Sequence, residues 1–274
     1  MRTLRYDGTP DGFLCAAAEA LGESPLPTIT SMPRGQPTQG FLFQQETVHT
    51  DAQRTAGLIE RVEAICGHKS VSATFCALLA DHPQRDTWLL HTMATALGAA
   101  CSFEDLAGDA TVHSLLKLVQ AVRREIHRFK GILRFSELRD GTYYAPVTPD
   151  HNIVVALAPY FTQRLGDRPW VIHDQRRDVA VHFDGSRVRP VDAANATSAG
   201  LEYAEKEAEY RACWRTYCRE IAVQERINPR LQRQFLPMRY WQHLPEMHSD
   251  SPTLRKGLPR TTSQKKNADT STAP

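Results

Sequence analysis

An amphipathic helix constrains this chain more than any other stretch of its sequence. Between Val112 and Phe129, apolar residues recur at intervals of three and four, which is the spacing of one helical face. Such a face packs against a core, so the sequence predicts an interior helix here. The apolar residues of this face are Val112, Leu115, Leu116, Val119, Val122, Ile126 and Phe129.

The opposite face of the same helix collects positive charge. The nearest acidic residue, Glu125, is expected at the edge of this face, close to Phe129. An anionic ligand such as a phosphate backbone is therefore expected to bind along it. The residues of this stripe are Lys117, Gln120, Arg124, His127 and Arg128.

A hairpin follows the helix. Asp140-Gly141 stands between two short runs rich in β-forming residues and is typical of a two-residue loop. With that loop, Leu138 faces Tyr143, and Arg134 lies on the same side of the ribbon among apolar neighbours. An arginine in that environment needs a partner, either a carboxylate of the protein or a phosphate from outside.

The turn Thr148–His151 leads into another predicted helix. Asp150 stands in the position of an N-cap, which is enough to explain a carboxylate there. His151 then lies in the first helical turn, where an imidazole meets either a bound anion or water.

Three further strands are predicted between residues 170 and 191. If residues 175–178 form a four-residue loop, Trp170 pairs with Phe183, and His173 and His182 share the other face of the sheet. Two interpretations stay open for this pair: an acid/base site, or solvent-facing side chains of an antiparallel sheet. The charged residues beside them are Asp174, Arg176 and Arg177.

The first hundred residues are read as a strand followed by helices. The strand Thr3–Tyr6 ends at Asp7, which is explained by turn chemistry or, alternatively, is a functional acid at a strand end. Residues 25–40 contain four prolines and two glycines, so a surface loop is expected. Helical spacing then predicts a bundle of three helices over residues 51–106.

The C-terminal part is predicted to start with a long helix over residues 201–226, docked through aromatic side chains that include Trp214. Two short helical turns follow, in which arginines alternate with aromatics; this pattern suits a phosphate backbone and an unstacked base. Alternatively, Tyr240 and Trp241 are packing anchors. The nucleic-acid-binding candidates of this segment are Arg230, Arg233, Tyr240 and Trp241.

Composition narrows the class of protein. The 274 residues are 41% hydrophobic, enough for a full core, and the net charge of +2 makes any attraction to nucleic acid depend on local patches. The six cysteines form no C-x-x-C pair and no zinc-type spacing, so no metal and no cofactor are expected. No signal peptide and no run of eighteen apolar residues is present, which predicts a soluble, cytoplasmic protein.

The predicted fold class is α+β. We expect a mixed or antiparallel sheet built from the N-terminal strand, the hairpin and the three-stranded meander, flanked by a helical bundle and a long C-terminal helix. The predicted organisation is a single domain over residues 1–247 and a disordered tail over 248–274. Within that domain we expect a helical sub-bundle at 51–106, a core at 112–191 and a C-terminal helical segment at 201–247.

Several short motifs carry a family resemblance. They are Tyr6–Thr9, Glu125–Phe135, Tyr144–Pro146, Pro149–His151, Trp170–Asp174, Asn228–Gln232 and Tyr240-Trp241. On these motifs, residues 4–247 resemble the bacterial proteins of DNA metabolism and repair that are associated with radical SAM proteins. The resemblance implies a nucleic-acid context and a radical SAM protein encoded nearby. Some members of that family carry an additional domain similar to uracil-DNA glycosylase, so the resemblance also implies a possible link to such a protein. It implies no particular reaction.

The first hypothesis for function is an accessory protein of DNA repair that binds nucleic acid beside a radical SAM enzyme. A weaker third hypothesis is a protein–protein adaptor for that enzyme. The side chains expected to hold nucleic acid are Lys117, Arg124, Arg128, Arg134, Arg177, Arg230, Arg233, Tyr240 and Trp241.

The second hypothesis is an enzyme, a hydrolase or lyase that acts on a damaged nucleotide. His127, His151 or His173 would be the general acid/base, with Asp7 or Asp174 orienting it. No nucleophile motif, metal cluster or phosphate loop supports this hypothesis, so it ranks below binding.

Overall fold

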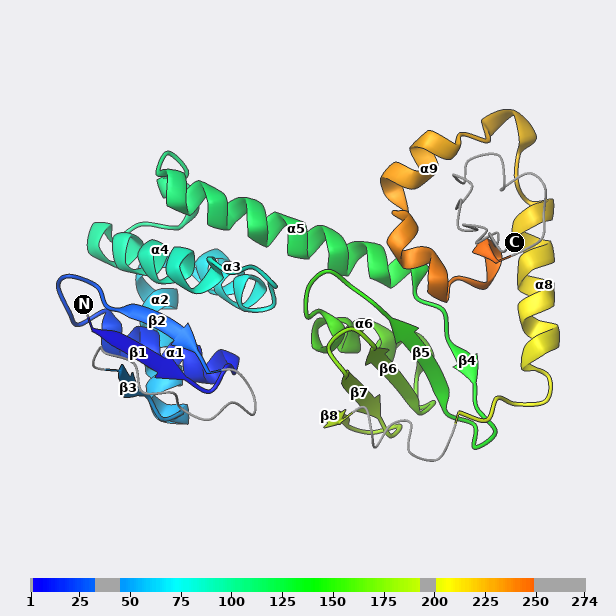
Figure 1. The fold of residues 1–274 in the computed structure, drawn as a ribbon, viewed down its shortest axis with the longest axis horizontal. Coiled ribbons are helices and arrows are strands. Elements are labelled where there is room, and N and C mark those ends of the chain that lie inside the picture. Colours follow the sequence, from blue (N-terminus) through cyan, green and yellow to red (C-terminus); the bar gives the residue numbers. More distant parts are fainter. Residues whose placement is uncertain (1, 33–44, 193–200, 249–274) are drawn as a thin grey trace, which may run out of the picture. The chain divides into compact units, whose positions relative to one another are not determined.

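Two compact units, Met1–Glu202 and Tyr203–Pro274, make up the chain. The computed structural model describes residues 2–32, 45–192 and 201–248. The first unit contains runs of helices and runs of strands, and helical segments make up the second, so the α+β class is confirmed (Figure 1).

The first unit begins with a small parallel sheet. Its strands are β1 (Thr3–Tyr6), β2 (Thr28–Ser31) and β3 (Gln45–Thr47), in the order β2-β1-β3. Helix α1 (Pro10–Ala20) follows β1, and the Thr9 hydroxyl accepts a hydrogen bond from the Gly12 N–H as its N-cap. The single predicted sheet was therefore wrong in one respect, because the N-terminal strand pairs in a sheet of its own. It pairs there with β2, which lies inside the stretch expected to be a loop.

Helices then cover this sheet. They are α2 (Ala52–Cys66), α3 (His68–Leu78), α4 (Arg85–Ala99), the 3₁₀ turn η1 (Glu104–Leu106) and the long α5 (Ala110–Ile132). The apolar face predicted for α5 is confirmed, since Val112, Leu115, Val119, Val122 and Phe129 are buried. The first half of α5 packs on α3 and α4, and Leu115 and Val119 belong to the same core as α1 (Figure 1).

The second half of α5 packs on α6 beside a five-stranded sheet. Its order is β4-β5-β6-β7-β8, parallel only between β5 and β6, which α6 connects. The predicted meander is confirmed: Trp170 pairs with Phe183, and a four-residue loop separates β6 from β7. The bounds are β4 (Ser136–Glu137), β5 (Tyr143–Val147), α6 (Val154–Leu165), β6 (Trp170–Asp174), β7 (Val179–Phe183) and β8 (Val188–Asp192).

The register of the hairpin differs from the prediction by one residue. Glu137, not Leu138, pairs with Tyr143. The Gly141 N–H donates to the Leu138 carbonyl (2.9 Å), and the Leu138 N–H donates to the Thr142 carbonyl (2.8 Å). With Gly141 at φ 83°, the connection is a three-residue loop with a left-handed glycine, which adds one residue to the predicted two-residue loop.

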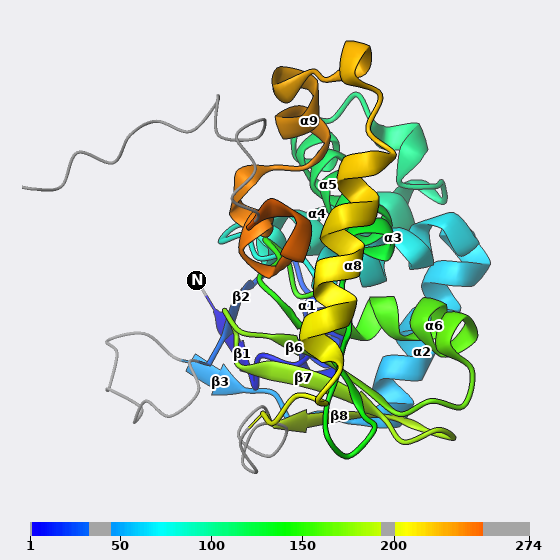
Figure 2. The same ribbon diagram turned by 90° about the vertical axis from the view of Figure 1, so that its right-hand side faces the viewer.

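The second unit consists of short helical segments. They are α8 (Glu207–Glu220), η2 (Gln224–Arg226), α9 (Pro229–Phe235), η3 (Met238–His243) and η4 (Pro245–Met247), seen from the side of α8 in Figure 2. The helix predicted over 201–226 is thus shorter at both ends. Its aromatic stripe was expected to be buried, yet Tyr210 is 61% and Tyr217 55% exposed. Trp214 alone of these three is partly covered, because its indole N–H donates to Glu246 (2.9 Å).

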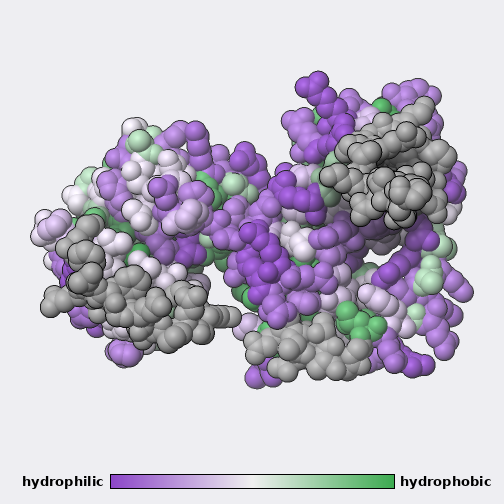
Figure 3. Space-filling model, viewed as in Figure 1, coloured by the Kyte–Doolittle hydropathy of each residue, from purple (hydrophilic) through white to green (hydrophobic). Residues whose placement is uncertain are grey.

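Two further expectations concerned the C-terminal tail and membrane-spanning segments. The disordered tail predicted for 248–274 lies outside the described residues from 249 onward. In the described ranges, no helix has both the length and the apolar content needed to cross a membrane. Hydrophilic side chains cover most of the molecular face drawn in Figure 3.

Candidate functional site

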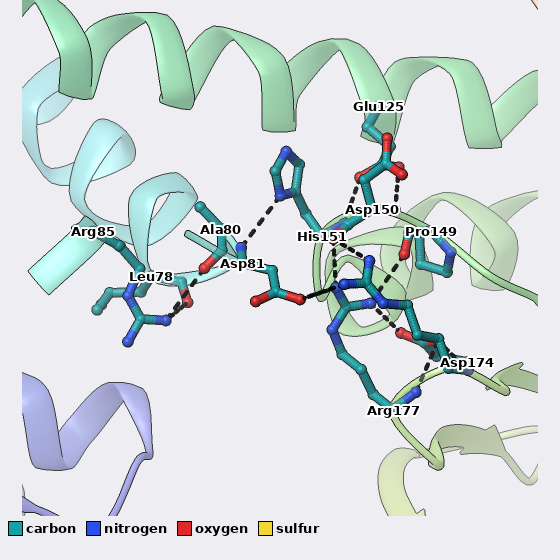
Figure 4. A network of polar contacts seen from close by, with 11 residues as sticks. Leu78, Ala80, Asp81, Arg85, Glu125, Pro149, Asp150, His151, Asp174 and Arg177 are labelled. Carbon is teal, nitrogen blue, oxygen red and sulfur yellow. Dashed lines mark hydrogen bonds and ion pairs between the residues drawn. The ribbon is translucent and has the colours of Figure 1, made fainter. Parts of the chain in front are cut away.

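A polar network lies where three parts of the first unit meet (Figure 4). Two of its segments follow β5 and β6 at the carboxyl ends of these parallel strands, a place where α/β sheets often position functional groups. The third segment is the loop between α3 and α4, and α5 lies across all of them.

Asp174 is the buried centre of this network. Its side chain is fully buried at the end of β6. One oxygen accepts the backbone N–H groups of Arg176 (3.0 Å) and Arg177 (3.3 Å), and the other accepts Nη1 of Arg177 at 2.7 Å. The guanidinium of Arg177 is itself mostly buried, so the pair is a charge-assisted contact shielded from water.

Asp81 links the α3–α4 loop to the two arginines. One Asp81 carboxylate oxygen lies 3.1 Å from Nη2 of Arg176 and 3.0 Å from Nη2 of Arg177. Both arginines also donate to the Asp150 carbonyl, and Arg177 donates to the Pro149 carbonyl. Residues far apart in sequence are thereby joined at one point, and both Nη1 and Nη2 of Arg177 donate to partners within the protein.

Arg85 supports the loop that carries Asp81. Its Nη1 donates to the carbonyls of Leu78 (3.1 Å) and Ala80 (3.4 Å), as Figure 4 shows. Its Nη2 donates to the Tyr6 hydroxyl (2.8 Å), which in turn donates to Asp86 (2.8 Å). Burial, and then the Asp86 carboxylate, raises the pKa of Tyr6 well above its ordinary value.

Glu125 has a role that the sequence pattern did not indicate. It was expected at the edge of the positive face, but it is 3% exposed. Its two oxygens accept the backbone N–H groups of Asp150 (2.6 Å) and His151 (2.9 Å). Asp150 was expected to cap the next helix, and this was wrong: α6 starts at Val154 without a side-chain cap, because Glu125 instead holds the preceding turn.

The hydrogen bond that His151 makes fixes which of its two ring nitrogens is the acceptor. Its Nδ1 accepts the backbone N–H of Asp81 at 3.2 Å. A ring nitrogen that accepts a hydrogen bond carries no proton, so the neutral ring bears its proton on Nε2. The half-buried imidazole therefore presents Nε2 as a hydrogen-bond donor.

His173 lies on the other face of the sheet. Its Nδ1 is 2.8 Å from the hydroxyl of Tyr144, and its Nε2 is 3.6 Å from the carboxylate of Asp178. The ring is 6% exposed, which excludes the solvent-facing interpretation for His173. Because side chains alternate along a strand, His173 is separated from Asp174 and His151 by the sheet.

Asp7 is occupied by turn contacts. One oxygen accepts the N–H (2.9 Å) and hydroxyl (2.6 Å) of Thr9, and the other accepts the Thr50 hydroxyl (2.8 Å). Slight burial opposes the effect, but these hydrogen bonds together hold the pKa of Asp7 below its ordinary range. The geometry matches the turn interpretation of Asp7.

The positive stripe of α5 lies away from the network. Lys117, Arg124 and His127 are exposed and Arg128 is half-buried. Arg134 was expected on the hairpin ribbon; instead its Nη1 donates to the carbonyls of Gly131 (3.0 Å) and Leu133 (3.2 Å) at the end of the helix. The predicted catalytic His127 stands two residues after Glu125 but is exposed, and among the described residues no hydrogen bond or ion pair joins it to the network.

In the second unit, the predicted nucleic-acid residues divide into two groups. Arg230 and Arg233 are exposed on α9. Tyr240 is 2% exposed, and the indole N–H of Trp241 donates to the Leu236 carbonyl (2.9 Å). Burial of Tyr240 leaves no ring face for a base, so the packing interpretation holds for this residue.

Two network residues, Asp81 and Glu125, were missed from the sequence. Glu125 stands three residues after Val122 and four before Phe129, so its place on the buried face was readable from the helical period. Asp81 carries no such signal, because its arginine partners lie 95 and 96 residues further along the chain.

The fold and network define an α+β protein whose long helix and buried carboxylates connect two sheets. Comparison with known protein families shows that the chain belongs to the family described as Domain of unknown function DUF4130, whose model matches residues 83–246. The match includes α5, the five-stranded sheet and the second unit up to residue 246, and it leaves out β1 to α3 together with Asp81. No curated protein and no solved structure matches the chain.

Proposed function

We propose that this protein binds nucleic acid through α5 and acts in DNA repair or DNA metabolism beside a radical SAM enzyme. One observation carries the proposal. Glu125 is the sole acidic residue between Ala110 and Ile132, and it is buried against the turn at Asp150 and His151. The exposed face of α5 therefore presents Lys117 and Arg124 with no acidic residue of the same helix beside them.

The positive charges on this face follow the helix axis, so they can contact successive phosphates of an extended nucleic acid. Lys117 and Arg124 are seven residues apart, which places them about 10 Å apart along the helix axis on the same side. In the part of the chain that the structure describes, neither side chain makes an ion pair. Cations that are exposed and unneutralised release counterions when they meet phosphates, which is the main source of affinity for nucleic acid.

Of the arginines predicted from the sequence, Arg124 is kept in this interface. Arg128 is left out because it is half-buried, and Arg230 and Arg233 because they lie in the second unit. Arg177 is held by Asp174, Asp81 and two carbonyls, and Arg134 is held by carbonyls at the end of α5. The proposed interface is the α5 stripe, defined as Lys117, Gln120, Arg124 and His127. The radical SAM partner, and a partner similar to uracil-DNA glycosylase, rest on the sequence motifs that resemble the repair-associated family.

The test is the salt dependence of DNA binding. Changing both Lys117→Glu and Arg124→Glu should weaken binding to a 20-nucleotide fluorescent oligonucleotide, in either duplex or single-stranded form, with little change in Tm. The slope of log Kobs against log salt concentration should become shallower by about 1.4 to 1.8, since each lost phosphate contact removes about 0.7 to 0.9.

A matched control removes the same charge elsewhere. Arg61→Glu with Lys69→Glu, on exposed positions of α2 and α3, makes the same total charge change. If the control and the α5 variant shift the slope equally, net charge explains the result and the α5 interface is refuted.

A catalytic role is the second candidate, and the orientation of His151 favours it. The imidazole is held by the Asp81 N–H at the carboxyl ends of two parallel strands, with a ring donor available. If the protein is a hydrolase or lyase on damaged nucleotides, His151→Gln should abolish cleavage or base release on a panel of damaged oligonucleotides. The control His182→Gln, on the other sheet face, should retain it, and activity that survives His151→Gln would exclude this role.

A further inference from the structure

Large apolar side chains are unusually exposed in the second unit. In the first unit, the described side chains of this kind are scattered over α2, α3, α6 and β8. In the second they follow one another along the chain, and Phe235 reaches 66% exposure. Three of them, Ile227, Leu231 and Phe235, also line one cavity, and apolar exposure gathered at one place marks an interaction surface. The exposed residues are Tyr203, Tyr210, Tyr217, Ile221, Val223, Ile227, Leu231, Phe235 and Met238.

Part of this surface is hollowed. A cavity of ≈ 420 Å³ is lined by the C-terminal half of α8, by the residues around η2 and by α9. These segments follow one another around an open arc in the second unit (Figures 1 and 2). We call this cavity the C-terminal groove. Its apolar lining is Ala222, Ile227, Leu231, Phe235 and Met247.

The charged side chains of the groove are mainly positive. Arg215, Arg219 and Arg226 line it together with one acidic residue, Glu246. Glu246 accepts the indole N–H of Trp214 at 2.9 Å, so its carboxylate is turned to a partner within the unit. An apolar floor with arginines around it complements a ligand that has one apolar face and acidic groups beside it.

We propose that the C-terminal groove binds an acidic amphipathic helix of a partner protein. A helix presents apolar side chains at intervals of three and four, which suits a row of aliphatic residues such as Ile227 and Leu231. A nucleotide fits less well, because Phe235 is the aromatic residue among the described residues that line the groove, and these include no second ring to enclose a base. Apolar side chains are also exposed beside the cavity lining, at Ile221 and Val223.

This inference deepens the proposed partnership, and it uses other residues than the α5 stripe. Each can therefore fail alone: loss of DNA binding in the α5 variant says nothing of the groove, and peptide binding to the groove says nothing of DNA.

The experiment uses the full chain and a designed probe. The probe is a fluorescein-labelled 18-residue helical peptide with leucines on one face and glutamates on the other. Its controls are the same peptide with lysine in place of glutamate, and a scrambled sequence of identical composition. Fluorescence anisotropy should show saturable binding of the acidic helix, and at least tenfold weaker binding of both controls.

Variants locate the binding site. Phe235→Glu and the double change Arg215→Glu with Arg226→Glu should each weaken binding of the acidic peptide at least tenfold. Phe75→Glu is the matched control, because Phe75 is also a large exposed aromatic residue, 47% exposed, on α3 of the first unit. It should leave peptide affinity unchanged. Circular dichroism before the binding assay should show the same total helical content in each variant as in the unchanged protein.

Other occupants would overturn the proposal, and each has its own signature. A dimer in sedimentation equilibrium that Phe235→Glu dissociates would make a second copy the occupant. Peptide binding that appears only in a chain ending at His248 would make the chain's own last residues the occupant. Binding of a single-stranded oligonucleotide that is lost with Phe235→Glu, without peptide binding, would make the groove a nucleic-acid site.

Discussion

Arg176 and Arg177 are neighbours that bind the same Asp81 oxygen but differ in what else they neutralise. Arg177 also pairs with Asp174, which is fully buried, whereas the Arg176 and Asp81 side chains are about half exposed. Removing one partner of a buried pair leaves an uncompensated charge, while an exposed pair contributes little.

We therefore expect Arg177→Met to lower the free energy of unfolding by about 3 kcal/mol, because Asp174 then keeps only backbone donors. Arg176→Met should lower it by no more than about 1 kcal/mol. Urea unfolding followed by circular dichroism measures both variants. Equal losses would show that Asp174 does not depend on the Arg177 guanidinium.

Tyr6 links stability to alkaline pH. In the unfolded chain a tyrosine ionises near pH 10, and in the folded protein burial and Asp86 raise the pKa of Tyr6. A raised folded pKa gives a stabilisation that is complete below about pH 10 and is lost as the pH rises above it. The free energy of unfolding should fall there by at most about 1.4 kcal/mol per pH unit from this group.

The comparison with Tyr6→Phe isolates that contribution. The variant loses the hydrogen bonds to Asp86 and Arg85, so it should be less stable at pH 8. Its stability should then fall less steeply between pH 10 and pH 11 than that of the unchanged protein. Parallel pH profiles of the two proteins would contradict the raised pKa.

At the scale of elements, the sequence predicted the buried face of a helix and the pairing of β6 with β7. It did not predict strand pairings that depend on the conformation of a loop or on a partner strand. The period of α5 and the loop between β6 and β7 predicted the buried face and the Trp170–Phe183 pair. The hairpin register failed because an Asp-Gly pair also suits a loop of three residues with Gly141 in the left-handed region. β2 was missed because four residues between prolines look like a loop, and their strand character comes from pairing with β1.

The two glycines of α2 provide an internal comparison of helix and cap. Gly57 lies exposed inside the helix, and a methyl group there would meet no atom within 4 Å. Gly67 ends the helix at φ 81° and ψ 164°, a region that other residues avoid. Gly57→Ala should stabilise the protein by about 0.5–1 kcal/mol, and Gly67→Ala should destabilise it by about 1–3 kcal/mol. Thermal unfolding measures both, and a stabilising Gly67→Ala would mean that the chain can relax out of this cap.

At the scale of the whole molecule, α5 makes the two sheets of the first unit depend on each other. Leu115 and Val119 belong to the core around α1, while Glu125 holds the turn after β5. The hydrogen bonds of Arg176 and Arg177 to Asp81 make a second link, between the α3–α4 loop and the loop that follows β6. Residues Met1–Glu202 are accordingly expected to unfold as one cooperative unit. None of these long-range links was readable from local sequence patterns, because each joins segments that are distant in the chain.

Leu115→Ala tests this cooperativity. Removing a fully buried leucine from the N-terminal core should cost about 2–5 kcal/mol. In a cooperative unit, hydrogen exchange should become faster by a similar factor, about a hundredfold for about 2.7 kcal/mol, in α1 and in the distant strands β6 and β7. Phe75→Ala, at an exposed position of α3, is the control and should leave both regions protected. If exchange accelerates in α1 while β6 and β7 keep their protection, the two sheets unfold independently, and α5 connects them without coupling their stability.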